Sequence, residues 1–191
     1  MTLSAPFPRD PHGGSPTRWE LLFGDLEAQA AAQDVAEADA LVSELTRAEH
    51  ATITVADRFR AGIGVAVVVD LLDGEPVRGT VREAADEWVL LQGAAPAGPA
   101  QHLVPLRAVT GVSGLGRHAA PGSRRDGAGL GPVLRALQRG RSFVLVRTLG
   151  GRVAGRIGRV GRDHLDVDDL TRPGGARLVP FGALLCVSEV S

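Results

Sequence analysis

The sequence predicts a mainly β protein in which a long N-terminal helix precedes two tandem five-stranded small barrels, each introduced by a short helix. Three observations lead to this fold class. The last two-thirds of the chain repeat one pattern, a long helical periodicity is confined to the N-terminal region, and the remainder alternates short apolar runs with Gly, Pro and Asp turn signals. Short strands at regular spacing between such turns are typical of small β-barrels and sandwiches.

The repeat is visible in aligned residues. Segments 102–113 and 177–188 match at six of twelve positions, which are Leu103/Leu178, Val104/Val179, Pro105/Pro180, Ala108/Ala183, Val112/Val187 and Ser113/Ser188. A shift of 76 residues extends the alignment upstream through Val67/Phe143, Val69/Leu145, Gly79/Gly155, Val81/Ile157, Glu87/Asp163, Val89/Leu165 and Leu91/Val167. Such repetition indicates that one compact unit was copied, so we expect both halves to fold alike.

The repeat also divides the 191-residue chain. We expect a disordered leader at 1–16, an acidic amphipathic helix at 17–50, a first barrel at 51–115, a Gly-rich linker at 116–130 and a second barrel at 131–191. Barrels of about 60 residues have thin cores. We therefore expect the two barrels to pack against each other or against the helix.

The N-terminal helix carries a start signal and an apolar stripe. Thr17 and Glu20, three residues apart, form a capping box. The stripe at helical spacing consists of Trp19, Leu22, Phe23 and Leu26, and a second apolar group follows at 41–45. A helix of about 30 residues must bury such a stripe. It could pack along both barrels, pair with a second copy of the chain or dock a protein partner.

The elements of each barrel follow in the same order. A short helix leads into an apolar strand, a hairpin turn, a strand with a central Gly, a second apolar strand, a loop, and a Val-Pro corner before the last strand. The helices are 55–62 and 131–140, the first strands 65–72 and 142–149, the turns Asp73-Gly74 and Gly150-Gly151, the central glycines Gly79 and Gly155, and the loops 93–101 and 171–176. A Gly inside a strand marks the sharp bend that a small closed barrel requires.

This arrangement resembles the Sm-like and SH3-like small barrels. The stretch DGEPVRGTVREAADEWVLLQG, residues 73–93, is similar to the first Sm motif, and the LVPL corner at 103–106 looks like the closing strands of PRC-type barrels. A long helix followed by two such barrels resembles a family of actinobacterial proteins of about this length. The RNA-facing Asn of Sm proteins is missing here, where Trp88 and His164 stand instead. The resemblance therefore implies a fold and carries over no RNA pocket.

Composition narrows the class of protein. The net charge is −1, but 17–50 carry −6, 51–115 carry −2 and 116–191 carry +7. All basic residues are Arg, and Lys, Asn and Tyr are absent, a bias typical of high-GC genomes rather than a nucleic-acid signal by itself. No apolar run reaches the roughly 18 residues of a membrane span, and the N-terminus is unlike a secretory signal. The single Cys186 is expected to be a buried, reduced thiol, so we expect a cytoplasmic protein.

No catalytic or metal site is expected. The run 150–156 echoes a phosphate loop but lacks its Lys and lies in a hairpin. Ser113 has no partnered His and Asp, and the five His residues show no zinc spacing. In the run 163–169 we expect Asp166 and Asp168 on one solvated strand face, with a cation site as the minor alternative. We expect no enzyme and no cofactor.

Two functions remain open. The first is an adaptor that works through protein–protein interaction or self-association, with Trp19, Leu22, Phe23 and Leu26 as the docking stripe. The second is RNA or DNA binding through an Arg-rich face of the second barrel, formed by Arg139, Arg141, Arg152, Arg156, Arg159 and Arg162. The near absence of exposed aromatic residues for base stacking favours the first function.

Overall fold

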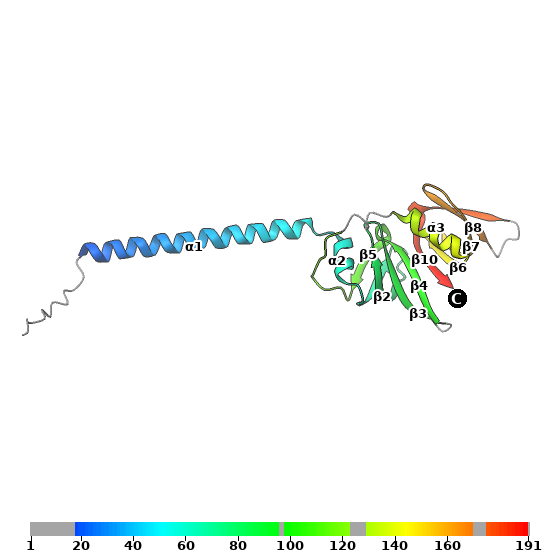
Figure 1. Ribbon diagram of the computed structural model, residues 1–191, viewed down its shortest axis with the longest axis horizontal. Helices are drawn as coiled ribbons and strands as arrows, with labels where there is room; N and C mark the ends of the chain where they lie inside the picture. Colours follow the sequence, from blue (N-terminus) through cyan, green and yellow to red (C-terminus); the bar gives the residue numbers. More distant parts are fainter. Residues whose placement is uncertain (1–17, 96–97, 123–128, 170–174, 191) are drawn as a thin grey trace, which may run out of the picture. The chain divides into compact units, whose positions relative to one another are not determined.

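The computed structural model describes residues 18–95, 98–122, 129–169 and 175–190 (Figure 1). It divides into two compact units, residues 1–52 and 53–191, which are described separately. The expected leader, Thr17 of the expected capping box, and part of the expected linker lie outside the described residues.

The first unit contains one long helix, α1, which spans Arg18–Thr52. Its sequence is rich in Ala, Leu and Glu, which are strong helix formers. Within the described residues, no helix is both long enough and apolar enough to cross a membrane.

The second helix, α2, spans Val55–Ala61 and begins with a complete capping box. The Thr54 hydroxyl accepts a hydrogen bond from the Asp57 N–H at 3.1 Å, and the Asp57 carboxylate accepts one from the Thr54 N–H at 2.9 Å. The Thr54 hydroxyl also donates a hydrogen bond of 2.7 Å to the Asp57 carboxylate, and this bond, followed by the one from the Thr54 N–H, is the main reason why the pKa of Asp57 is lowered. The cap marks the start of a separate helix, with two residues between it and the end of α1. Helix α3, Leu130–Gly140, plays the corresponding part ahead of the second repeat.

The rest of the second unit is a single antiparallel sheet of ten strands. The strands are β1 (Ala66–Leu71), β2 (Val77–Ala84), β3 (Trp88–Ala95), β4 (Gly98–Pro105), β5 (Val109–Ser113), β6 (Phe143–Thr148), β7 (Gly151–Val160), β8 (His164–Asp169), β9 (Ala176–Pro180) and β10 (Leu184–Val190). Their order in the sheet is β5-β1-β2-β3-β4-β10-β6-β7-β8-β9. The Val-Pro corners become short 3-10 turns, Leu106–Ala108 and Phe181–Ala183.

The prediction of two closed five-stranded barrels is wrong. Closure of the first barrel would pair β4 with β5, but β4 pairs with β10, through Leu103↔Val187 and His102↔Ser188. The sheet therefore stays open and runs from one repeat into the other, with β5 and β9 at its two ends. The topology nevertheless confirms the repeat, because both halves have the same strand order. The order is β5-β1-β2-β3-β4 in the first half and β10-β6-β7-β8-β9 in the second.

Irregularities in the sheet recur at equivalent places. The β2–β3 register shifts between Val81 and Glu83, and the β7–β8 register shifts between Ile157 and Arg159. The central glycines lie just before these shifts, where the neighbouring strand comes very close. A Cβ on Gly79 would lie 2.8 Å from the Gln92 carbonyl oxygen, and one on Gly155 would collide with the Asp168 carbonyl oxygen. The expected need for Gly is thus a need for close backbone approach.

The upstream alignment of the repeat needs one correction. Val67 lies opposite Gly79, and its counterpart opposite Gly155 is Val144 and not Phe143. Likewise Val69 corresponds to Val146 and not to Leu145, because the second hairpin turn is one residue shorter. A one-residue slip moves a side chain to the other face of a sheet. Accordingly Val144 and Val146 are buried like Val67 and Val69, whereas Phe143 and Leu145 are half-buried.

The loop expected at 93–101 is mostly strand. β3 and β4 continue their pairing through Gly93↔Ala100, Ala94↔Pro99 and Ala95↔Gly98. Local composition favours a loop, but the ladder with the adjacent strand decides the conformation. The other expected loop, 171–176, lies mostly outside the described residues.

Two apolar cores share the strands at the centre of the sheet. On β4, Leu103 belongs to the core of the second repeat and Val104 to that of the first. On β10, Leu184 and Val187 face the second core, whereas Leu185 and Cys186 face the first. Burial of each such aliphatic side chain contributes about 1.5–3 kcal/mol. We call the region where β4 meets β10 the junction; it joins the repeats into one folded unit.

Candidate functional site

The basic face predicted on the second repeat is only partly assembled. Arg139 and Arg141 at the end of α3 and Arg156 on β7 line one open groove of about 650 Å³, which also includes Gln138, Gly158 and Asp168. We call it the Arg groove. Gln138 ties its two sides together, because its side-chain amide donates a hydrogen bond of 2.7 Å to the Gly158 carbonyl oxygen.

Local structure explains how the three arginines are held. Arg141 caps α3 in the left-handed conformation, with φ of 51°, and its N–H donates to the Gln138 carbonyl. Arg156 lies directly across from Phe143 in the β6–β7 ladder, and its guanidinium carbon is 4.6 Å from the Phe143 ring centroid. This cation–π contact orients Arg156 over the end of α3 without neutralising it. The groove therefore holds three cationic groups and the Asp168 carboxylate.

Arg152 lies in a different environment. It forms an ion pair with Glu75 of the β1–β2 hairpin in the first repeat. Arg147 joins the same group, with its Nε 2.9 Å from Asp73 Oδ2 and one terminal nitrogen donating to the Glu75 carbonyl oxygen at 2.7 Å. The Nε–H has no well-directed acceptor, so its contact with Asp73 is ionic. Arg152 is thus paired with a residue of the first repeat instead of facing the Arg groove.

The last two predicted arginines lie outside the Arg groove. Arg159 is exposed near the end of β7, across from Asp166. Arg162 is exposed in the β7–β8 turn beside Asp163, whose carboxylate lies 2.8 Å from His164 Nδ1. The hydrogen bond with His164 is the main cause that lowers the pKa of Asp163. Of the six predicted arginines, three share one groove, one is paired with Glu75, and two stand apart.

The predicted docking residues form an apolar stripe on α1, made of Trp19, Leu22, Phe23 and Leu26. Their exposed fractions on the helix lie between 49% for Leu22 and 68% for Trp19. The Trp19 and Phe23 rings are neighbours one turn apart, with centroids 6.5 Å apart. The stripe therefore offers four large apolar side chains on about two turns of helix.

A polar cluster at the junction was not predicted. His102 on β4 and Ser188 on β10 are paired across the two strands, and His102 Nδ1 lies 2.8 Å from Ser188 Oγ. Cys186 Sγ is 3.5 Å from the same hydroxyl. Burial raises the pKa of the Cys186 thiol. Burial, followed by the charge of Arg147, lowers the pKa of His102. Sequence reasoning could not place His102 beside Ser188, because they are 86 residues apart.

This cluster has the residue types of a nucleophilic site but not its electrostatics. A reactive thiolate needs a lowered pKa and access to solvent, and Cys186 has the opposite of both, with 2% of its surface exposed. Metal chemistry has no support either in the part of the chain that the structure describes, which contains no group of three His, Cys, Asp or Glu residues able to hold an ion.

The sequence matches no protein family model, and no curated protein matches it significantly.

Proposed function

We propose that this chain is a non-enzymatic cytoplasmic adaptor that binds another protein through the apolar stripe of α1. The observation that carries the proposal is the exposure of four large apolar residues on consecutive turns of one helix face. Burying such a side chain contributes about 1.5–3 kcal/mol, so covering all four supports stable binding. Helix-in-groove recognition uses the same i, i+3, i+4 and i+7 spacing.

The charge of the helix suggests the chemistry of the partner. Residues 17–50 carry eight acidic residues and two Arg. A partner groove with an apolar floor and a basic rim complements this surface. The burial of Cys186, together with its 3.5 Å contact to the half-buried Ser188 hydroxyl, supports the non-enzymatic part of the proposal.

The test is affinity capture from extracts of the native host with the full-length protein as bait. We expect Trp19→Ala/Phe23→Ala to lose a protein that the wild type retains, whether or not nuclease is added. Leu41→Ala is the matched control, because it removes an exposed apolar residue from the same helix outside the stripe. Identical captured proteins for the wild type and the double variant would contradict the proposal.

The Arg groove favours a second candidate function, the binding of RNA or DNA phosphates. Three cations around one open groove can hold phosphate oxygens without reading bases. We expect retention on RNA or heparin that falls with salt, with a slope of about 2 for three contacts to a single strand. Arg139→Ala/Arg141→Ala/Arg156→Ala is expected to abolish retention. Arg78→Ala/Arg82→Ala/Arg117→Ala makes the same charge change at exposed sites elsewhere and is expected to preserve it.

A further inference from the structure

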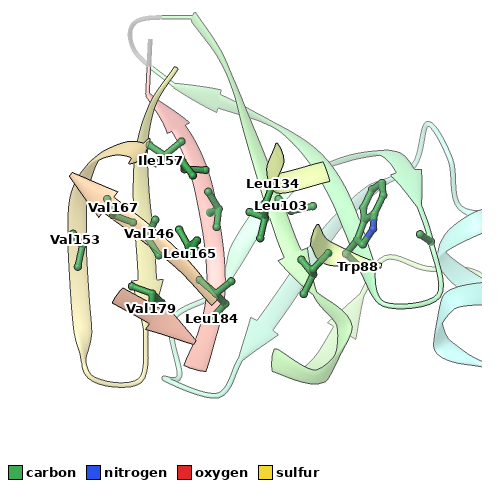
Figure 2. Packing of buried hydrophobic residues seen from close by; sticks show 14 residues of the cluster. Trp88, Leu103, Leu134, Val146, Val153, Ile157, Leu165, Val167, Val179 and Leu184 are labelled. Carbon is green, nitrogen blue, oxygen red and sulfur yellow. The ribbon is translucent and has the colours of Figure 1, made fainter. Parts of the chain in front are cut away.

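The junction shows how one repeat of this chain binds another. Strand β4 of the first repeat adds antiparallel to β10 of the second, and Leu103 is 1% exposed there. Leu103 packs in one cluster with residues of α3 and β10, which are Leu130, Leu134, Leu184 and Val187. Figure 2 shows Leu103 beside Leu134, with Trp88 of β3 close by. The first repeat thus inserts a leucine between the lead-in helix and the last strand of the second.

The two ends of the sheet are the repeat equivalents of these two strands. Strand β9 corresponds to β4, and β5 corresponds to β10. The junction pair Leu103↔Val187 has Leu178 and Val112 as its counterparts, and His102↔Ser188 has Arg177 and Ser113. Among the described residues, β9 pairs only with β8, and β5 only with β1. Each copy of the chain therefore carries both halves of a second junction, at opposite ends of its sheet.

Burial at the two ends differs from burial at the junction. Leu178 is 57% exposed, whereas its counterpart Leu103 is 1% exposed. At the other end, α2 and β5 border a groove of about 220 Å³ lined by four apolar side chains together with three other residues; the lining is Val55, Val109, Val112 and Leu115 with Arg58, Thr110 and Gly111. We call it the β5 groove. It occupies the place that Leu103 fills in the second repeat, between the lead-in helix and the last strand.

Charge at the two ends is complementary. In the junction Arg147 is near enough to His102 to influence it. Arg147 lies across from Cys186, and its counterpart in the first repeat is Asp70, which lies across from Gly111. The counterpart of His102 is Arg177. The junction thus has two basic side chains, Arg147 and His102, close together. The equivalent positions at the free ends carry opposite charges, on Asp70 and Arg177. Both are exposed, and neither forms an ion pair with another described residue.

We propose that the β9 edge of one copy of this chain binds the β5 edge of a second copy, with Leu178 in the β5 groove and Arg177 beside Asp70. The contact is antiparallel strand addition, as at the junction. It uses different surfaces on the two copies, so it is head to tail and leaves one free end of each kind.

The contact between copies is weaker than the junction inside the chain. Strand β5 has Thr110 and Gly111 where β10 has Leu185 and Cys186, so less apolar surface is buried. The Asp73 and Glu75 pairs with Arg147 and Arg152 also have no counterpart at the ends. Association is therefore expected to be reversible and concentration-dependent.

The test is sedimentation velocity of the full-length protein over about 1 to 300 µM, a range suited to weak interfaces. The wild type is expected to shift from the 19.9 kDa monomer to larger species. Leu178→Glu is expected to weaken association at least about tenfold. Leu149→Glu is the matched control, because it changes another exposed leucine of the same repeat, in the β6–β7 turn. A wild type that stays monomeric over the whole range overturns the proposal.

Charge reversal identifies the two surfaces. Asp70→Arg and Arg177→Asp are each expected to reduce association, and the double variant is expected to restore it. An equimolar mixture of the two single variants is also expected to restore association, with the variants in alternation, because each end of one variant then meets an opposite charge on the other. Failure of both the double variant and the mixture to restore association overturns the proposal.

This inference and the adaptor proposal can fail separately. Trp19→Ala/Phe23→Ala is expected to leave self-association unchanged, because the α1 stripe is not part of the contact. If that variant abolishes association and Leu178→Glu does not, α1 is the self-association surface and the edge contact is wrong.

Discussion

The two repeats share a strand order but differ where one binds the other. At the junction, β4 and β10 present Leu103, Leu185 and Cys186, all at most 2% exposed. At the equivalent places on the free ends, Leu178 is exposed, and Thr110 and Gly111 replace the other two. The copies thus differ at positions that are buried at the junction and lie at a free end in the other repeat. Apolar residues gather where one repeat covers the other, and smaller or polar residues stand where a repeat faces outward.

The largest effect is expected at the central glycines. Gly155→Ala places a Cβ against the Asp168 carbonyl oxygen, and Gly79→Ala places one 2.8 Å from the Gln92 carbonyl oxygen. Neighbouring backbone cannot move away cheaply, so we expect losses of about 1–3 kcal/mol or more, larger at Gly155. Urea unfolding measures both. Gly182→Ala is the control, because no atom lies within 4 Å of its Cβ position. Equal stability of all three variants would contradict close approach as the reason for Gly.

The next largest loss of stability is expected on substitution of Arg147, in contrast to its counterpart Asp70. Arg147→Met leaves the Asp73 carboxylate without its cation in a site where the Arg147 side chain is 13% exposed. We expect a loss of about 1–3 kcal/mol, since the Asp73 carboxylate loses its cation and the Glu75 carbonyl loses a charged donor. Asp70→Ala at the exposed equivalent position is expected to change stability by less than about 0.5 kcal/mol. A double-mutant cycle of Arg147 with Asp73 measures the coupling energy between them. A coupling energy near zero would show that this ionic contact does not stabilise the folded chain.

The pH dependence of stability distinguishes His102 from its counterpart Arg177. The pKa of His102 is lowered in the folded state, first by burial and then by Arg147. The unfolded chain therefore binds a proton first as the pH falls below about 6.5, and stability decreases from there until the lowered folded pKa is passed. The slope for one proton is at most about 1.4 kcal/mol per pH unit.

Urea unfolding between pH 7.5 and 5 measures this slope. His102→Gln is expected to flatten the stability curve over that window. His118→Gln, which changes an exposed imidazole away from the junction, is expected to keep the wild-type curve. A wild-type free energy of unfolding that does not change between these pH values would contradict the predicted contribution of His102.

The smallest effect is expected at Thr148, which is 8% exposed and corresponds to Leu71 in the first repeat. Its hydroxyl donates a hydrogen bond of 3.0 Å to the Gly151 carbonyl oxygen across the hairpin. Thr148→Val removes this bond but adds buried apolar surface, so we expect a change within about 1 kcal/mol in thermal unfolding. A larger loss would show that the second hairpin depends on this bond in a way that the first does not.

Part of the site could be predicted from the sequence. The alternation of Arg and apolar residues along 152–157 correctly puts Arg152 and Arg156 outward, with Val153 and Ile157 buried. It does not reveal that Glu75 pairs with Arg152 while Phe143 holds Arg156 at the Arg groove. The partners differ because they come from different strands, and no local pattern encodes which strand lies alongside. His102 and Ser188 escaped prediction for the same reason.

By itself, the sequence determined the long helix, the short lead-in helices, the order of strands within each repeat and the equivalence of the two halves. These depend on periodicity, turn residues and repetition, which are local properties of the chain. Only the tertiary structure decided which edges meet. A strand edge can close on its own repeat or add to the other one with the same backbone hydrogen bonds. The choice of β10 as the partner of β4 follows from how Leu103, Leu184, Leu185 and Val187 pack between the two cores.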